Sequence, residues 1–350
     1  MRHRSSISQF DVISQLRFPL IVLVTFAHSY SGVSGDYSLL ADWNTYEFLK
    51  LLISQTLVKV AVPVFYIISG YLFFVNVKEW SGQVYRQKIM RRVRTLLIPY
   101  LLWNLLMAWK LRVFSWDVFW VFWKSAGVQI DWFGHEQLMT APANMPLWFL
   151  RELMIVSLLT PIIYIGIKKL GGWLLAGLTV FYLSGVCAFV PGLSAYGVFF
   201  FTLGSFLGIR KMDLVKTMLR FERPAYVLSF LLVFAMMLTY RSVAFSSVML
   251  CFRIVGAVAV FCLAYRIFAS TNGRLPAVVC DSSYFIYLAH FVFFMSFVDD
   301  LIFWIMGSQD TFALSVHYLL APLLKVAVLV AVYAVYRFSV KIVRKNLDKG

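Results

Sequence analysis

Charge is scarce in this sequence. Only 14% of its 350 residues are charged, whereas 61% are hydrophobic and 18% are aromatic. A soluble domain carries about 25% charged residues, so the composition argues against one. Apolar stretches of about 20 residues, the length that crosses a bilayer, recur almost to the carboxyl end, and the connections between them are mostly too short to fold separately. The sequence therefore predicts a polytopic membrane protein with a single integral domain over residues 1–350.

Cysteine and several catalytic signatures are missing or rare. The four cysteines, Cys187, Cys251, Cys262 and Cys280, form no CxxC pair, so neither a disulfide framework nor a metal site is predicted. The sequence has no GxSxG and no GxxxxGK[ST] motif, and these are the signatures of serine esterases and nucleotide hydrolases. Fixed-period repeats and low-complexity tracts are absent as well.

Acidic residues are few, which leaves a large basic excess. The chain has 16 Asp and Glu against 32 Lys and Arg, a net charge of +16. The basic residues gather in short loops between the apolar stretches, chiefly KEWSGQVYRQKIMRRVR and RKMDLVKTMLRFERP. In membrane proteins such loops are cytoplasmic. The charge therefore predicts a lipid bilayer as the partner, and not nucleic acid.

The apolar stretches predict an all-α integral membrane protein of about ten transmembrane helices with both termini cytoplasmic. In the second span, Pro63 and Gly70 predict a break or kink. The segment before Pro146 is rich in tryptophan, which suits stacking on sugars, an interfacial aromatic belt or a helix on the membrane surface. The tryptophans are Trp116, Trp120, Trp123 and Trp132. The approximate spans are 14–32, 48–77, 95–109, 147–167, 172–189, 196–209, 225–240, 247–268, 284–306 and 318–338.

The first span carries two ionisable residues. Arg17 and His28 are eleven positions apart, which in a continuous helix places them about 20° apart in azimuth and about 16 Å apart in height. Ionisable groups within a membrane span tend to face the bundle interior or a wet cavity, so the pair predicts a site. The alternative is that Arg17 is a cytoplasmic anchor and His28 a polar interfacial residue. If the helix begins at Pro19, Arg17 lies outside it and the shared face is lost.

Two further ionisable residues lie in or beside later spans. Glu152 in the fourth span is adjacent to Arg151. It is a candidate for orienting His28 or binding an acceptor; the alternatives are that it pairs with its neighbour or is solvated at the interface. His290 in the ninth span is a functional candidate by its position in the membrane, with a structural hydrogen bond as the alternative.

Five motifs follow one another along the chain. They are Arg17 and His28 with ten residues between them, VPVFYIISGYLFF, RRVRTLLIPYLLW, PLWFLREL at residues 146–153 and SSYFIYLAHFVFF at residues 282–294. Together they resemble the acyltransferase 3 family of bacterial membrane enzymes, which O-acylate glycans with an acyl-CoA donor. The likeness covers essentially the whole chain.

The resemblance implies that His28 is the general base that takes the proton of a sugar hydroxyl, and that Arg17 acts in catalysis by holding the coenzyme A portion of the donor. Glu152 is a further candidate for catalysis, and Trp148 and His290 are candidates for binding the acceptor. The family also has a basic pair spaced by four residues before its third span; here the candidates for binding the donor's phosphates are Lys88, Arg91, Arg92 and Arg94, and the same residues also act as a topological anchor.

The resulting prediction is an acyltransferase of the bacterial inner membrane. It moves an acyl group, expected to be acetyl, from cytoplasmic acetyl-CoA to a hydroxyl of an extracytoplasmic or lipid-linked saccharide, with no cofactor beyond this acyl-CoA donor. A transporter or exporter of acyl groups or glycans and a non-catalytic scaffold are the alternatives. Paired broken helices in inverted repeats would favour transport, whereas the sequence indicates only one conspicuous break.

Overall fold

The computed structural model describes residues 7–28, 44–110, 124–130, 136–185, 192–240, 242–271, 274–292, 295–307 and 310–347. Its contacts divide them into two compact units. Unit 1 draws on Phe10–Val58 and Ile267–Gly350, and unit 2 on Ile7–Gln9 and Lys59–Arg266. Since unit 1 combines two distant parts of the chain, this division does not follow chain order, and the single integral domain stays a prediction.

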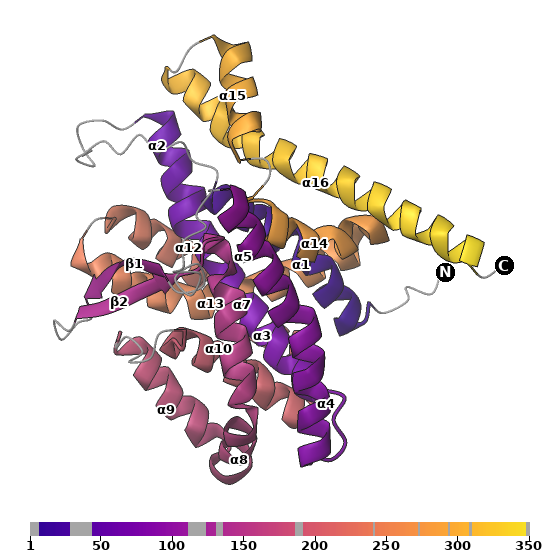
Figure 1. Ribbon diagram of the computed structural model, residues 1–350. Helices are drawn as coiled ribbons and strands as arrows, with labels where there is room; N and C mark the ends of the chain where they lie inside the picture. Colours follow the sequence, from indigo (N-terminus) through magenta and orange to yellow (C-terminus); the bar gives the residue numbers. More distant parts are fainter. Residues whose placement is uncertain are drawn as a thin grey trace, which may run out of the picture. The chain divides into compact units, whose positions relative to one another are not determined.

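Unit 1 consists of helices from both ends of the chain (Figure 1). The hydroxyl of Ser54 lies 2.9 Å from the carbonyl oxygen of Phe26 and 2.7 Å from the hydroxyl of Tyr318. Phe26 and Tyr318 also share a buried cluster with Tyr46, so this core joins the first helix to the last. The elements are α1 (Gln9–Ala27), α2 (Thr45–Lys50), a π-helical turn (Leu51–Thr56), α14 (Ala277–Ala289), α15 (Met295–Met306) and α16 (Thr311–Leu347).

Unit 2 contains most of the remaining helices and one β-hairpin. A 3-10 turn (Leu57–Val60) lies at its boundary with unit 1. The elements are α3 (Ala61–Phe74), α4 (Gly82–Arg92), a π-helical turn (Val93–Leu97), α5 (Ile98–Lys110), β1 (Lys124–Ile130), β2 (Glu136–Ala141), a 3-10 turn (Met145–Leu147), α7 (Trp148–Leu158), α8 (Thr160–Leu170), α9 (Gly172–Leu183), α10 (Ala195–Ile209), α11 (Leu214–Leu219), α12 (Glu222–Leu238) and α13 (Val243–Thr271).

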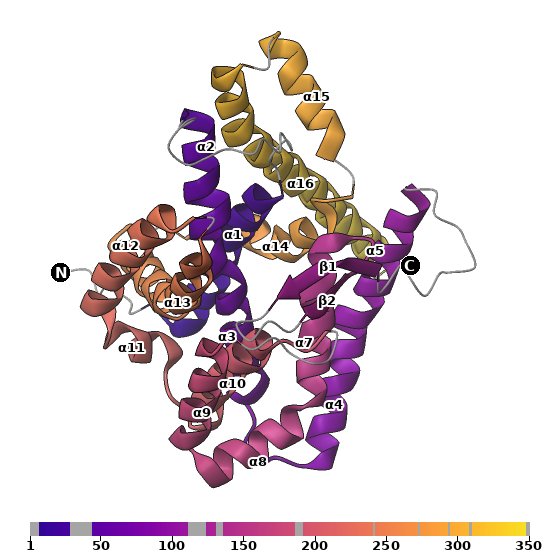
Figure 2. The ribbon, with the colours of Figure 1, turned by 90° about the vertical axis from the view of Figure 1, so that its left-hand side faces the viewer.

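Helices α3 and α10 form the centre of unit 2 (Figure 2). A Cβ atom on Gly204 would collide with the carbonyl oxygen of Ile67, and one on Gly208 would collide with that of Tyr71. Small residues let two helix backbones approach this closely. Because both contacts advance by four positions on each helix, α3 and α10 run parallel. Positions in unit 2 can therefore be described as nearer the amino-terminal or the carboxyl-terminal end of α3.

The described residues contain four helical stretches that are long and apolar enough to cross a membrane: Gln9–Ala27, Thr45–Phe74, Val243–Ser270 and Thr311–Val343. A fifth is formed if the bent pair Met145–Leu158 and Thr160–Leu170 is one span. This pair bends by 59°, at the point where Pro161 lies in the first turn of α8 and cannot continue the hydrogen bonding of α7. The protein is thus a helical membrane protein, whereas ten spans and cytoplasmic termini stay predictions.

The sequence analysis predicted only helices, but the described residues also form one β-hairpin. Strands β1 and β2 pair antiparallel from Lys124 opposite Ala141 to Ile130 opposite Glu136. They lie between α5 and α7, where the sequence analysis expected an aromatic belt or a surface helix. Pairing the two strands satisfies backbone groups that a loop would leave to water. The four tryptophans of this segment lie outside the described residues.

Two details of the predicted spans are wrong. The break expected at Pro63 and Gly70 is absent, since α3 runs through both; the irregular turns, Leu51–Thr56 and Leu57–Val60, come before it. Pro63 lies in the first turn of α3, where a proline needs no backbone donor. The ninth span is not one helix either, because α14 ends at Ala289 and α15 begins at Met295.

Candidate functional site

Helix α1 is continuous from Gln9 to Ala27 and contains both Arg17 and Pro19. His28 follows its last residue, and the amide of His28 donates to the carbonyl oxygen of Thr25 at 3.2 Å. The alternative in which the helix begins at Pro19 is therefore wrong. Because no break separates them, the angle of about 20° between Arg17 and His28 applies to this helix.

Helix α14 lies along α1. The amide of Leu275 donates to the side chain of Gln15 at 2.7 Å. Further along both helices, the ring centroids of His28 and His290 are 5.5 Å apart, and the ring of Phe291 meets that of His28 edge-on at 6.0 Å. The two helices are thus parallel, and the structure brings together two of the predicted site residues, His28 and His290.

Arg17 also faces α14, about 16 Å from His28 along α1. Its guanidinium charge acts on Cys280 and Asp281, near the beginning of α14. The Asp281 carboxylate is itself paired with Arg337 of α16 at 2.7 Å. Arg17 remains exposed, so the structure places a guanidinium and an imidazole on one side of α1 without bringing them into contact.

His290 is buried, and its two ring nitrogens differ. Nδ1 lies 3.1 Å from the carbonyl oxygen of Ile286 and 2.9 Å from that of Tyr287. A nitrogen facing two acceptors carries the proton, so a neutral ring presents a lone pair at Nε2. This buried Nε2 has no hydrogen-bond partner among the described residues. The structural hydrogen bond at Nδ1 therefore leaves Nε2, on the ring that contacts His28, to accept a proton donor.

Helix α16 lies antiparallel to α14. Asp281 pairs with Arg337, and four positions on, the ring of Phe285 contacts that of Tyr333 at 6.0 Å. Lys325 lies on the same face of α16, two turns from Tyr333 toward the amino-terminal end of the helix. Its ammonium charge acts on the His290 imidazole, so α16 brings a cation near the histidine pair.

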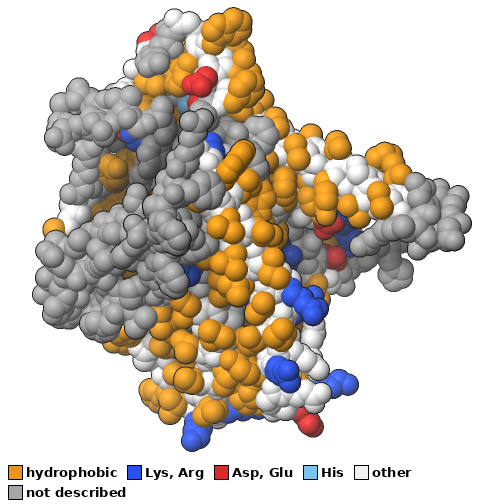
Figure 3. All heavy atoms as spheres, in the orientation of Figure 1, with side chains coloured by type: hydrophobic (Ala, Val, Ile, Leu, Met, Phe, Trp, Pro, Cys, Tyr) orange, Lys and Arg blue, Asp and Glu red, His pale blue; other side chains and the backbone are white. Residues whose placement is uncertain are grey.

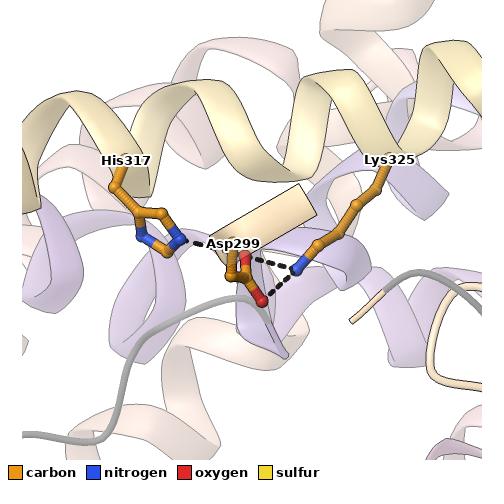
Figure 4. Close-up of polar contacts among 3 residues, drawn as sticks. All are labelled: Asp299, His317 and Lys325. Atoms are coloured by element: carbon orange, nitrogen blue, oxygen red, sulfur yellow. Dashed lines mark hydrogen bonds and ion pairs between the residues drawn. The ribbon is translucent and has the colours of Figure 1, made fainter. Parts of the chain in front are cut away.

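Lys325 belongs to a cluster on α15 and α16 (Figure 4). Its side chain is only 1% exposed, and its Nζ lies 2.8 and 2.9 Å from the two carboxylate oxygens of Asp299. Nε2 of His317 lies 2.9 Å from the same carboxylate, and Phe303 stacks on the His317 ring at 4.3 Å. The sequence analysis gave Asp299 and His317 no role and missed Lys325. The signal was available, because a lysine inside the apolar run of the tenth span requires a partner.

Glu152 lies in unit 2, in the second turn of α7. Its Oε2 accepts hydrogen bonds from the hydroxyls of Tyr66 at 2.9 Å and Ser194 at 2.6 Å, and the guanidinium of Arg151 acts on its charge. Trp148 lies one turn earlier on α7. Glu152 is thus more than a self-paired residue, whereas the expectation that it orients His28 stays a prediction.

The predicted donor-binding cations Lys88 and Arg92 lie near the carboxyl-terminal end of α3. Lys88 and Arg92 share the ring of Phe73, at 5.1 and 5.7 Å from its centroid, and Arg92 donates to the Ser69 hydroxyl at 2.9 Å. Burial lowers the pKa of Lys88, and the charges of Arg92, Arg91 and Lys211 add to this effect.

Arg91 and Arg94 are exposed. Figure 3 shows Lys and Arg side chains gathered over this end of unit 2, where α4 and α8 lie. Of the four cations expected to bind the donor, the structure therefore brings Lys88 and Arg92 together on one ring and leaves Arg91 and Arg94 at the surface beside them.

Comparison with known proteins gives a consistent result. Residues 11–336 match the acyltransferase 3 family, which is described as an acyltransferase domain. A curated relative, the succinoglycan biosynthesis protein ExoH of Rhizobium meliloti (strain 1021), is 26% identical over 166 residues. The match covers 45% of this chain and 43% of the relative, which is less than half of either protein. No solved structure matches the chain. With the family covering nearly all of the helices described above, the chain belongs to the acyltransferase 3 family.

Proposed function

We propose that this acyltransferase moves an acyl group, acetyl in the simplest case, from acyl-CoA to a hydroxyl of a saccharide, with His28 as the general base. The observation that carries the proposal is the contact of His28 with His290, whose Nε2 lone pair has no partner among the described residues. His28 can take the proton of the attacking hydroxyl, while His290 accepts a hydrogen bond at Nε2 from a second hydroxyl of the saccharide and so holds the acceptor in place.

The reaction is an acyl transfer between oxygen and sulfur. The hydroxyl oxygen attacks the thioester carbonyl carbon while neutral His28 takes the hydroxyl proton. The carbon–sulfur bond then breaks, the coenzyme A thiolate leaves, and the imidazolium of His28 returns the proton to the sulfur. Proton and electrons balance without an oxidant or a metal, and an ester and free coenzyme A are the products.

The donor is proposed to extend along α1. Arg17 lies about 16 Å from His28, and a guanidinium binds phosphate oxygens through two parallel hydrogen bonds. Lys88 and Arg92 in unit 2 are the second candidates for the phosphates of the donor. Both lie against the ring of Phe73, and burial, then the charges of Arg92, Arg91 and Lys211, lower the pKa of Lys88, so an anion placed here would meet several cations. Trp148 and Glu152 are proposed to contact the acceptor.

The acceptor and the location of the protein are supported more coarsely. The printed name of the relative ExoH concerns the biosynthesis of a polysaccharide, which supports a saccharide acceptor, free or lipid-linked. The basic loops support cytoplasmic sides for α4 and for the segment after α10. We therefore propose ten spans, cytoplasmic termini and a place in the bacterial inner membrane.

The test uses the full chain in lipid nanodiscs with labelled acetyl-CoA and a pool of envelope saccharides. Thioester cleavage should depend on the acceptor, and label should appear in an ester. The substitution His28→Ala should lower this rate by about 10²–10⁴-fold, the contribution expected of a general base. Phe10→Ala, at an exposed position on the same helix, is the matched control and should keep the wild-type rate.

The outcomes separate the classes of function. Full activity of His28→Ala would remove this residue from the mechanism. The same protein in sealed vesicles tests the alternatives. Label that crosses the bilayer as intact acetyl-CoA would identify a carrier, and the absence of both turnover and transport would indicate a scaffold.

A further inference from the structure

Two cations in unit 2 lie within candidate membrane spans. Lys59 is in the 3-10 turn before α3, and Arg253 is about three turns from the beginning of α13. Their chain neighbours Val60 and Phe252 pack in one buried cluster, and the Lys59 and Arg253 charges act on each other. Neither cation has a carboxylate partner among the residues that the structure describes. Positive charge is thus concentrated at this place.

Aromatic rings hold the Arg253 side chain. Its guanidinium lies over the ring of Tyr196 at 4.7 Å from the centroid. The ring of Tyr196 in turn contacts those of Tyr182 at 6.3 Å and Tyr66 at 5.7 Å. Nε of Arg253 is buried and has no hydrogen-bond partner in the described part of the chain. The guanidinium is therefore held in one orientation with donor capacity to spare.

The nearby carboxylate does not neutralise these cations. Glu152 acts on Tyr196, but its oxygen accepts from Tyr66 and Ser194, and the cation that acts on it is Arg151. One negative charge with its own cation thus accompanies two further positive charges. Charges without a counterion in apolar surroundings are unfavourable, so this arrangement favours the entry of an anion.

We propose that Lys59 and Arg253 bind an oxyanion, a carboxylate or a phosphate, carried by the acceptor saccharide. A guanidinium fork binds such a group through two parallel hydrogen bonds, and the ammonium adds a point charge. The inference rests on the proposed function, which supplies the saccharide, and it adds that the saccharide is acidic or carries a phosphate.

The position within unit 2 favours the acceptor over the donor. Glu152, which is proposed to contact the acceptor, and its hydrogen-bond partner Tyr66 are joined to this site through the ring of Tyr196. The cations proposed for the donor, Lys88 and Arg92, lie toward the far end of α3. A helix of 14 residues is about 21 Å long, so the two groups of cations serve different ligands.

The binding test uses the full chain in nanodiscs of phosphatidylcholine, which has no net charge, with calorimetry as the readout. The probes are a glucuronate-containing oligosaccharide, the same oligosaccharide with its carboxyl groups reduced to alcohols, and undecaprenyl phosphate. At least one anionic probe should bind about tenfold or more tightly than the reduced oligosaccharide. The carboxylate probe reports a uronic acid in the acceptor, and the phosphate probe reports a lipid-linked acceptor.

The variants assign this preference to the two residues. Arg253→Gln and Lys59→Met should each weaken anion binding about tenfold or more and leave the reduced oligosaccharide unaffected. Lys169→Gln, at an exposed basic position of α8, is the matched control and should bind as the wild type does. If Arg253→Gln does not fold, Arg253→Lys replaces it; this variant keeps the charge without the fork and should lose part of the preference.

Several results would overturn the proposal. Equal binding of the anionic and the reduced probes would do so, as would unchanged anion binding by both variants. The third such result is binding of phosphatidylglycerol alone when this lipid is added to the nanodiscs, because the ligand would then be a bilayer headgroup. His28→Ala should keep the anion preference, so the two proposals fail separately. If the wild type binds anions but does not cleave the thioester, only the proposed reaction is contradicted. If it cleaves the thioester with equal KM for charged and reduced acceptors, only the anion site is contradicted.

Discussion

The two clusters of charge around cations of the candidate spans, one in each unit, contain similar residues but differ in the balance of positive and negative charge. In unit 1, Lys325 is enclosed and both oxygens of Asp299 lie against it. In unit 2, Lys59 and Arg253 act on each other and have no such carboxylate among the described residues. A cluster that neutralises itself holds helices together, whereas one that retains excess charge is suited to a ligand. Balance, more than the presence of charge in a membrane span, separates a structural cluster from a candidate binding site.

The largest predicted effect breaks the balanced cluster. Asp299→Asn leaves the enclosed Lys325 without a counterion, and removal of one partner of a buried pair costs about 3–5 kcal/mol of folding stability. The measurement is unfolding in mixed micelles. Asp281→Asn is the control, because its pair with Arg337 is about half exposed and such pairs contribute about 0–1 kcal/mol. Equal losses in the two variants would mean that burial does not distinguish the pairs.

The unbalanced cluster should respond in the opposite direction. Without ligand, Arg253→Gln removes a charge that has no carboxylate partner among the described residues, so the free energy of unfolding should stay the same or rise by up to about 1 kcal/mol. The same unfolding assay measures it. A loss as large as that of Asp299→Asn would show that Arg253 has a structural role, and the contrast between the clusters would then be lost.

The smallest predicted effect concerns the partly exposed cations near the other end of α3. Burial and then the charges of Arg92, Arg91 and Lys211 lower the pKa of Lys88. An anion favours the charged form, so bound coenzyme A should raise this pKa toward its ordinary value, by about 0.5–1 unit. NMR of isotopically methylated lysines reports the titration, and Lys88→Arg assigns the signal. An unchanged titration at saturating coenzyme A would exclude this surface as the phosphate site.

Part of the candidate site could be predicted because it depends on one helix. The spacing of Arg17 and His28 fixes their relative angle once the helix is continuous, and α1 is continuous. The lone pair of His290 at Nε2 could not be predicted in this way. It depends on where α14 ends, which places Nδ1 against the carbonyl oxygens of Ile286 and Tyr287, and on the packing of that end against His28.

The remaining features require contacts between distant parts of the chain. Lys59 and Arg253 are 194 positions apart in the sequence, and neither was singled out, since a single basic residue in a span is also explained as an anchor. The irregular turns between Leu51 and Val60 were likewise missed, because the sequence signal for a break, Pro63, falls in a first helical turn where proline is tolerated.

The sequence by itself determined that this is a helical membrane protein, what its family is and which helix carries the candidate base. Apolar length and helical period are properties of short stretches, so they can be read without knowing what those stretches touch. Only the tertiary structure decided which buried charges are neutralised. Neutralisation depends on the distance between side chains from separate helices, and that distance is set by packing.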